Sequence, residues 1–250
     1  FDFARDRLSA RKAWFFFHAE YVCLGAGITC DSDNAVVTTV NQCHLRGDAI
    51  VAGKKVEAGE HDVAAPGWVH HDQVAYVFPQ PGKARLRNDV QSGDWKRINR
   101  ESPSRPVQVK VFRLWLEQGT RPKDETYAYV VAPRMPASAV GPYAADLPVE
   151  ILANTPAHQA VRHKALGIAG AAFYEPGRLA IRDGLMVGVD RPCLLLLRAT
   201  PKGYAVSLAN PKNAALTVRV GIETGSRTLE KAVALPDGLP AGSSVTVELP

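Results

Sequence analysis

Alternation of apolar and polar residues is the feature of this sequence that most limits its possible folds. Apolar residues occupy every second position from Leu216 to Ile222, and again from Val245 to Leu249. Successive side chains of a strand point to opposite faces, so this spacing predicts strands with one buried face. The continuous apolar run Leu194–Leu197 predicts a strand that is covered on both faces. We therefore expect an all-β fold, a large antiparallel β-sandwich architecture.

One of the expected strands changes phase. Its apolar residues occupy odd positions from Val107 to Val111 and then even positions from Phe112 to Leu116. Because a shift of one residue exchanges the two faces of a strand, this pattern predicts a β-bulge near Val111 and Phe112.

Proline and glycine divide the chain into short segments. The pairs Pro66–Gly67 and Pro81–Gly82 predict turns. The stretch Pro133–Asp146 contains three prolines and many small residues, and we expect it to connect two β units, residues 1–140 and 146–250. Local pattern predicts a helix only in the stretch 155–166, where Thr155 can cap and Pro156 occupies the first turn.

Charge and cysteine content limit the partners and the compartment. The net charge of +5 favours an anionic partner, although the basic residues are scattered rather than grouped. Cys23 and Cys193 lie in apolar strands and are predicted to be core residues. Cys30 and Cys43 lie in more polar sequence and could pair in an oxidising compartment, a question that the spacing leaves open.

Several motifs that resemble functional sites have simpler interpretations. His70 and His71 would point to opposite faces of a strand, so they cannot share a metal ion. The glycines of "GAG", residues 25–27, lack the third glycine and the following helix of a dinucleotide loop, and we interpret them as a turn. Asp31 and Asp33 lie in loop-like sequence, where carboxylates usually face solvent. We expect no cofactor, and a structural calcium ion bound by these two residues is the weaker alternative.

Tryptophans are candidate platforms for sugar rings, whose apolar faces stack on aromatic side chains. Trp115 alternates with core residues and is predicted to be buried. Trp95 lies in the turn-rich stretch "QSGDWKRINR" and is predicted to be exposed, so it is the better candidate for a ligand contact.

Seven segments of the chain, in order, resemble polysaccharide lyase family 8, the family of hyaluronate, chondroitin AC and xanthan lyases. The stretch 10–28 is similar to the family's A-R-K-S-W-F-F-F-D-D-E-I-V-C-L-G-A-G-I. The other six segments read "VVTTVNQC", "GWVHHDQVAYVFP", "SGDWKRIN", "VFRLWLEQG", "YAYVVAP" and "EILANTPAHQAVRH". In "GWVHHDQVAYVFP", Gln73 replaces a family glycine, and the whole similarity extends from about Ala10 to Phe173.

The resemblance implies a fold. Members have an N-terminal helical domain, a central β super-sandwich and a smaller C-terminal β domain. Residues 1–140 would then be the later part of the super-sandwich and residues 146–250 the C-terminal β domain. Trp14 and Phe16 would be core on one face of a strand, Phe15 and Phe17 on the other, and the stretch 150–166 would be extended rather than helical.

The resemblance also implies a reaction, β-elimination at a uronic acid of an anionic polysaccharide. The family's catalytic asparagine, histidine, tyrosine and arginine belong to the helical domain, so no catalytic residue is assigned here and the chain alone is expected to be inactive. Its expected partners are the polysaccharide and a helical domain, covalently joined or as a nicked chain, with no nucleic acid and no membrane. The resemblance implies a secreted or periplasmic enzyme without cofactor.

A non-catalytic carbohydrate-binding module and a purely structural fragment are the alternatives to the lyase portion. For substrate contacts we select polar or aromatic residues at strand ends, because they can meet carboxylate, sulfate or hydroxyl groups. These are Asn41, Gln42, His70, Arg85, Arg87 and Trp95.

Overall fold

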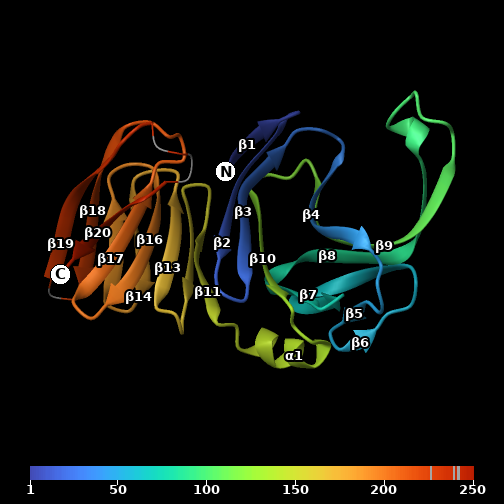
Figure 1. Ribbon diagram of the computed structural model, residues 1–250, viewed down its shortest axis with the longest axis horizontal. Helices are drawn as coiled ribbons and strands as arrows, with labels where there is room; N and C mark the ends of the chain where they lie inside the picture. The colour runs from blue at the N-terminus through green and yellow to red at the C-terminus, as the bar shows by residue number, and fades with distance from the viewer. Residues whose placement is uncertain (226, 239, 241–242) are drawn as a thin grey trace.

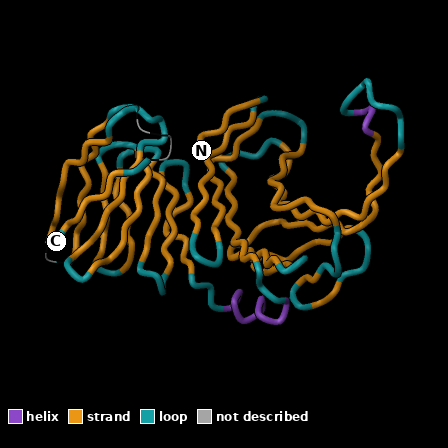
Figure 2. The backbone as a smooth tube through the Cα atoms, viewed as in Figure 1, coloured by secondary structure: helices purple, strands orange, loops and turns teal. Residues whose placement is uncertain are grey.

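The computed structural model describes residues 1–225, 227–238, 240 and 243–250, and strands dominate it (Figures 1 and 2). A ten-stranded sheet contains residues 2–133. Its order along one path is β1 (Asp2–Arg5), β2 (Leu8–Phe16), β3 (Tyr21–Cys30), β10 (Glu125–Pro133), β8 (Val74–Asp94), β7 (Glu60–His71), β5 (Ile50–Val51) and β6 (Lys54–Lys55). Strand β9 (Pro106–Thr120) also pairs with β8, and β4 (Ala35–His44) pairs with β9.

The strands from Val149 to Leu249 form a two-sheet sandwich, here called the C-terminal sandwich. Its six-stranded sheet has the order β11 (Val149–Asn154), β12 (His158–His163), β13 (Ile168–Phe173), β16 (Cys193–Thr200), β17 (Gly203–Ala209) and β20 (Val245–Leu249). Its four-stranded sheet has the order β14 (Gly177–Arg182), β15 (Leu185–Val189), β18 (Leu216–Thr224) and β19 (Arg227–Leu235). The strands pair antiparallel, and one core fills the space between the two sheets. The all-β expectation is confirmed.

The α-helix of the structure lies in a different segment from the one that the local sequence pattern predicts. Residues 158–163 form strand β12, as the family resemblance implies, so the helix predicted for 155–166 is wrong. The α-helix α1 (Ala137–Ala145) instead lies in the proline-rich connection. It forms there because Val140, fully buried, packs against Ala75 and Ala132 beneath the ten-stranded sheet. No helix among the described residues is long and apolar enough to cross a membrane.

The phase change in β9 has another cause than a bulge at Val111 and Phe112. The pairing of β9 with β8 continues without a shift through these residues, while the shifts in its pairing with β4 lie at Val36/Val37 and Thr39/Asn41. Residues 106–110 are exposed on both faces, and burial begins only beyond them. The pattern therefore marks where the strand enters the packed sheet.

Glycine and proline also mislead at three points. Pro66–Gly67 and Pro81–Gly82 lie inside strands β7 and β8, at a local shift of their pairing, and not in turns. Gly25 lies inside β3, opposite Tyr127 of β10, whose ring occupies the space that a Cβ atom would need. The glycine is required by this close approach rather than by a turn.

Two apolar runs are covered on only one face. Phe15 and Phe17 pack on the core between β3, β10 and the C-terminal sandwich, as expected, but Trp14 is 46% and Phe16 is 72% exposed. In β16, Leu195 is buried whereas Leu194 and Leu196 are exposed, because only one face of the six-stranded sheet is covered by the four-stranded one.

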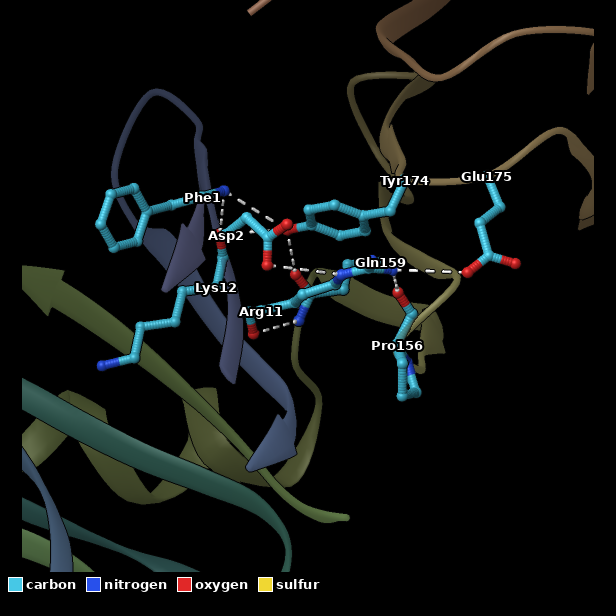
Figure 3. Close-up of polar contacts among 8 residues, drawn as sticks. All are labelled: Phe1, Asp2, Arg11, Lys12, Pro156, Gln159, Tyr174 and Glu175. Atoms are coloured by element: carbon cyan, nitrogen blue, oxygen red, sulfur yellow. Dashed lines mark hydrogen bonds and ion pairs between the residues drawn. The ribbon is translucent and has the colours of Figure 1, made fainter. Parts of the chain in front are cut away.

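A polar network joins the ten-stranded sheet to the C-terminal sandwich (Figure 3). The fully buried Gln159 of β12 donates to the carbonyl oxygen of Arg11 at 3.4 Å and accepts from the hydroxyl of Tyr174 at 2.8 Å. The guanidinium of Arg11 lies 4.7 Å from the centre of the Tyr174 ring and bonds to the carbonyl oxygen of Pro156. The buried amide of Gln159 thus bonds both to the ten-stranded sheet and to the C-terminal sandwich, and these hydrogen bonds hold the two in one arrangement.

The four cysteines are free thiols, so Cys30 and Cys43 are not bonded to each other. Burial raises the pKa of Cys23 to about 11 and that of Cys193 to about 12, as suits core residues.

Candidate binding groove

A two-stranded ribbon, which we call the arm (residues 90–110), extends beyond the ten-stranded sheet (Figure 1, green). Val90–Asp94 of β8 pair there with Pro106–Lys110 of β9. Strand β7 accompanies β8 only as far as Arg87, and β4 ends at His44, opposite Val111. Two strands alone are marginally stable in water, so exposed apolar side chains on such a ribbon indicate a contact with a ligand or another chain.

The tip of the arm is the 3-10 turn η1 (Trp95–Arg97), which holds Trp95 outward. One carboxylate oxygen of Asp94 accepts from the backbone N–H of Lys96 at 2.9 Å, and the other accepts from the hydroxyl of Ser104 at 2.5 Å. These hydrogen bonds lower the pKa of Asp94, the Ser104 bond most. Trp95 is 61% exposed, as predicted.

A groove of about 660 Å³ runs along the arm to strand β4. Val107 and Val109 supply its aliphatic part, and Trp95 and Ile98 line the end near the tip. Gln42, Gln91, Ser92, Asp94 and Arg97 add polar groups to the lining, and the Asp94 carboxylate is already engaged by Lys96 and Ser104. An aromatic side chain, aliphatic surface and a few amides and a guanidinium are the groups that a pyranose ring with hydroxyl and acidic substituents contacts.

The tip of the arm is basic. Between Asp94 and Arg105 the sequence holds four basic residues (Lys96, Arg97, Arg100 and Arg105) and two acidic ones (Asp94 and Glu101). This local excess contrasts with the scattered charge of the rest of the chain and favours an anionic ligand at the groove.

The structure brings two of the six predicted contact residues together, since Gln42 and Trp95 both line the groove. Asn41 instead donates to the hydroxyl of Tyr76 at 2.5 Å on the opposite face of β4. His70 is buried and its Nε2 donates to the carbonyl oxygen of Met135 at 2.9 Å. Neither Asn41 nor His70 lines the groove, because both serve the packing of the sheet.

Arg85 and Arg87 lie on β8, just before the arm begins, and both form ion pairs with carboxylates. Arg85 forms ion pairs with Glu60 at 2.5 Å, Asp62 at 3.3 Å and Glu117 at 3.3 Å. Both oxygens of Asp89 accept from Nε of Arg87, at 2.9 and 3.0 Å. Their positive charge is thus largely compensated within the sheet.

Arg113 is a residue that the sequence reasoning missed. It lies on β9 directly between Gln42 of β4 and Arg87 of β8. Its guanidinium lies 4.7 Å from the centre of the Trp115 ring, and its buried Nε has no hydrogen-bond partner. Among the described residues no carboxylate forms an ion pair with it. The sequence did hold a signal for it, because residues two apart on a strand lie on the same face and Arg113 precedes Trp115 by two.

Other titratable residues lie in separate environments. Asp31 and Asp33 form ion pairs with Arg7 and Arg121, each at 2.6 Å. His71 stacks on Phe112 at 4.2 Å between ring centres and accepts from the N–H of Arg46 at 3.0 Å, while His70 bonds elsewhere. Within the described ranges, no three histidine, cysteine or carboxylate side chains converge on one point.

Comparison with known proteins identifies relatives over nearly the whole chain. Residues 1–144 match the super-sandwich domain of polysaccharide lyase family 8, and residues 150–219 match the C-terminal beta-sandwich domain of the same family. A chondroitinase AC from Pedobacter heparinus is 35% identical over 97% of this chain and 35% of its own length. A xanthan lyase from a Bacillus species is 33% identical over 67% of this chain and 20% of its own length.

Solved structures agree with these matches. A chondroitinase AC lyase studied in oligosaccharide complexes superimposes with a TM-score of 0.90 and 32% identity, over 98% of this chain and 37% of that one. A chondroitin AC lyase from Streptomyces coelicolor superimposes with a TM-score of 0.73 and 26% identity, over 92% of this chain and 31% of that one. The chain thus spans about a third of the length of these chondroitin AC lyases.

Proposed function

The chain belongs to polysaccharide lyase family 8, and from this premise we propose that it is the C-terminal β portion of a lyase that cleaves a uronic-acid-containing polysaccharide by β-elimination. The relatives are named for chondroitin, xanthan and hyaluronate, which gives the class of substrate but not the individual polymer. We propose further that the enzyme is secreted or periplasmic, where such polymers occur.

The observation that supports this role most strongly is the groove along the arm. Trp95 offers a flat apolar surface to a sugar ring, and Gln42 can hydrogen-bond its hydroxyl groups. Arg97 in the lining and Arg113 beside Gln42 are guanidinium groups that match carboxylate or sulfate geometry. In this proposal the groove is one wall of the substrate cleft.

The proposal assigns the proton transfers to another part of the enzyme. β-Elimination needs a group that removes the proton next to the uronate carboxyl, a group that protonates the leaving oxygen, and a neutralising contact to the carboxylate. We assign none of these roles to a residue of this chain. The helical domain implied by the resemblance would supply them, either in the same polypeptide or as a separate fragment.

A second candidate function is that of a stand-alone carbohydrate-binding module. The observation in its favour is that Trp95 and Gln42, an aromatic and an amide side chain suited to a sugar ring, line one groove of this chain. The two functions differ in whether a helical domain increases the affinity for the polysaccharide. A module would bind equally well without it.

Oligosaccharide binding tests the proposal. We expect hyaluronan or chondroitin sulfate oligosaccharides to change the tryptophan fluorescence of the chain and Trp95→Ala to remove most of that change. Trp14→Ala is the matched control, since Trp14 is the other well-exposed tryptophan and lies outside the groove. Equal loss in both variants, or no binding by the unaltered chain, would contradict a sugar site at the arm.

A further inference from the structure

A cavity of about 360 Å³ opens at one end of the C-terminal sandwich, between its two sheets. This is the end at which β11 begins, a few residues after α1. Ile181 and Leu185 of the four-stranded sheet and Leu197 of the six-stranded sheet form apolar walls, and Tyr204 also lines the cavity. Its volume lies within the range of small-molecule sites, about 300–1,000 Å³.

A β-bulge turns Arg182 toward this cavity. Ala180 of β14 opposes Met186 of β15. The next opposed pair is Arg182 and Leu185, so β14 has one extra residue between the two pairs. Opposed residues of an antiparallel pair share a face, and Leu185 belongs to the core between the two sheets. Regular alternation would place Arg182 on the outer face with Ala180, whereas the bulge adds its guanidinium to the lining of the cavity.

A second guanidinium reaches the cavity from the other sheet. Arg162 of β12 opposes Ala169 of β13, a core residue, and therefore lies on the inner face of the sandwich. One terminal nitrogen of Arg162 bonds to Glu150 at 2.5 Å, but its buried Nε has no hydrogen-bond partner. Because a buried N–H without a partner destabilises the fold, an acceptor oxygen in the cavity would be bound favourably.

The mouth of the cavity is basic. Lys164 lines it as well, and its ion pair with the exposed Asp146 contributes little in water. Arg182 is exposed, and in the part of the chain that the structure describes no carboxylate forms an ion pair with it. Positive groups at the mouth and aliphatic walls behind them favour a ligand with an anionic end and an apolar body.

We propose that this cavity binds a medium-chain fatty acid, with the carboxylate held by Arg162 and Arg182 and the aliphatic tail against Ile181, Leu185 and Leu197. A sugar ring fits this cavity less well, because apolar walls leave buried hydroxyl groups without hydrogen-bond partners. The site belongs to the C-terminal sandwich and lies apart from the groove along the arm, so the inference is independent of the sugar-binding role of the arm.

Calorimetric titration of the 250-residue chain with three compounds tests the proposal. Octanoate has both the charge and the tail, 1-octanol lacks the charge, and acetate lacks the tail. We expect octanoate to bind about tenfold or more tightly than either of the others, because the walls and the arginines each contribute. The affinity of octanoate should also fall with increasing salt, whereas that of 1-octanol should not.

Two variants test whether binding occurs in this cavity. Ala199 lines it at an exposed strand position, so Ala199→Leu should obstruct the cavity without disturbing the core and weaken octanoate about tenfold. Ala180→Leu is the matched control, since Ala180 is exposed on the outer face of β14, and it should bind octanoate like the unaltered chain. Arg182→Gln should weaken octanoate by about fivefold and leave the affinity for 1-octanol unchanged.

Four outcomes would overturn the proposal. One is the absence of octanoate binding, and another is equal affinity for octanoate and 1-octanol, which would show that the arginines do not recognise the carboxylate. Equal weakening by Ala199→Leu and Ala180→Leu would place the bound octanoate elsewhere. Displacement of octanoate by a chondroitin disaccharide would show that the cavity is a sugar site instead.

Discussion

Gln42 and Trp95 line one groove, although Gln42 lies on β4 and Trp95 lies at the tip of the arm between β8 and β9. Whether the amide from the sheet and the aromatic ring from the tip can reach the same ligand depends on the position of the arm. Residues that hold the tip should therefore affect ligand binding through the position of Trp95.

Asp94 lines the groove and also holds the tip, because its carboxylate bonds to the N–H of Lys96 and the hydroxyl of Ser104. Loss of a capping side chain costs about 1 kcal/mol, so Asp94→Ala should weaken oligosaccharide binding by about fivefold. Asp94→Asn keeps an oxygen for the N–H and should retain most of the affinity. Titration by tryptophan fluorescence measures all three proteins. Equal affinities for the alanine and asparagine variants would contradict this role.

Arg113 should contribute to the binding of charged sugars. Its guanidinium has no carboxylate partner among the described residues and lies beside Gln42 on the sheet. Because a hydrogen bond to a charged group contributes about 1.5–3 kcal/mol, Arg113→Ala should weaken the binding of a uronate oligosaccharide by about tenfold or more. The salt dependence of binding should become shallower in the same variant.

Arg219→Ala, on the distant C-terminal sandwich, is the control for Arg113, with no expected effect on either quantity. An Arg113→Ala variant with unchanged affinity and unchanged salt dependence would remove Arg113 from the site.

Gly25→Ala should destabilise the fold. The added Cβ would overlap the ring of Tyr127, whose position is fixed between β3 and the core. Overpacking of this kind costs about 1–3 kcal/mol. Gly82→Ala is the matched control, since nothing lies within 4 Å of its added Cβ. Urea unfolding of the two variants measures the difference, and equal free energies of unfolding would show that Tyr127 can move away.

His71 should make the fold sensitive to mild acid. Burial lowers the pKa of His71 below its usual value of 6.5, although the charge of Asp72 opposes this shift. The unfolded chain therefore binds a proton at a pH at which the folded chain does not, and stability falls as the pH decreases through and below 6.5.

Thermal unfolding between pH 7 and pH 5 tests this expectation. His71→Gln should lower stability overall, because the stacking on Phe112 is lost, but should give a shallower pH dependence than the unaltered chain. His18→Gln, at an exposed position, should keep the original slope. A parallel decline in all three proteins would assign the acid sensitivity to other groups.

The sequence allowed the strands to be predicted wherever one face of a strand is buried, as in residues 216–222 of β18. It failed where the deciding contact is distant in the chain. Gly25 resembles a turn residue until Tyr127, on another strand, is seen above it. Helix α1 contains Gly141 and Pro142, poor helix formers, and depends on the burial of Val140 beneath the sheet.

The candidate site was predictable only in part, for a related reason. The turn-rich sequence around Trp95 indicated exposure correctly, and Gln42 was chosen from a strand end. Arg85 looked equally suitable, because Glu60 and Glu117 cannot be placed beside it without the register of β7, β8 and β9. Arg87 pairs with Asp89, two residues further along the same strand, and this alternation in the sequence was overlooked.

The division of labour between this chain and a helical domain is the central claim, and absorbance of the unsaturated uronate product tests it most directly. The purified chain is mixed with hyaluronan and with chondroitin, and its intact mass of 27.0 kDa is verified in the same sample. The account predicts binding, by the fluorescence change, together with a flat absorbance trace. A rising trace from the same pure chain would show that its own residues carry out the elimination.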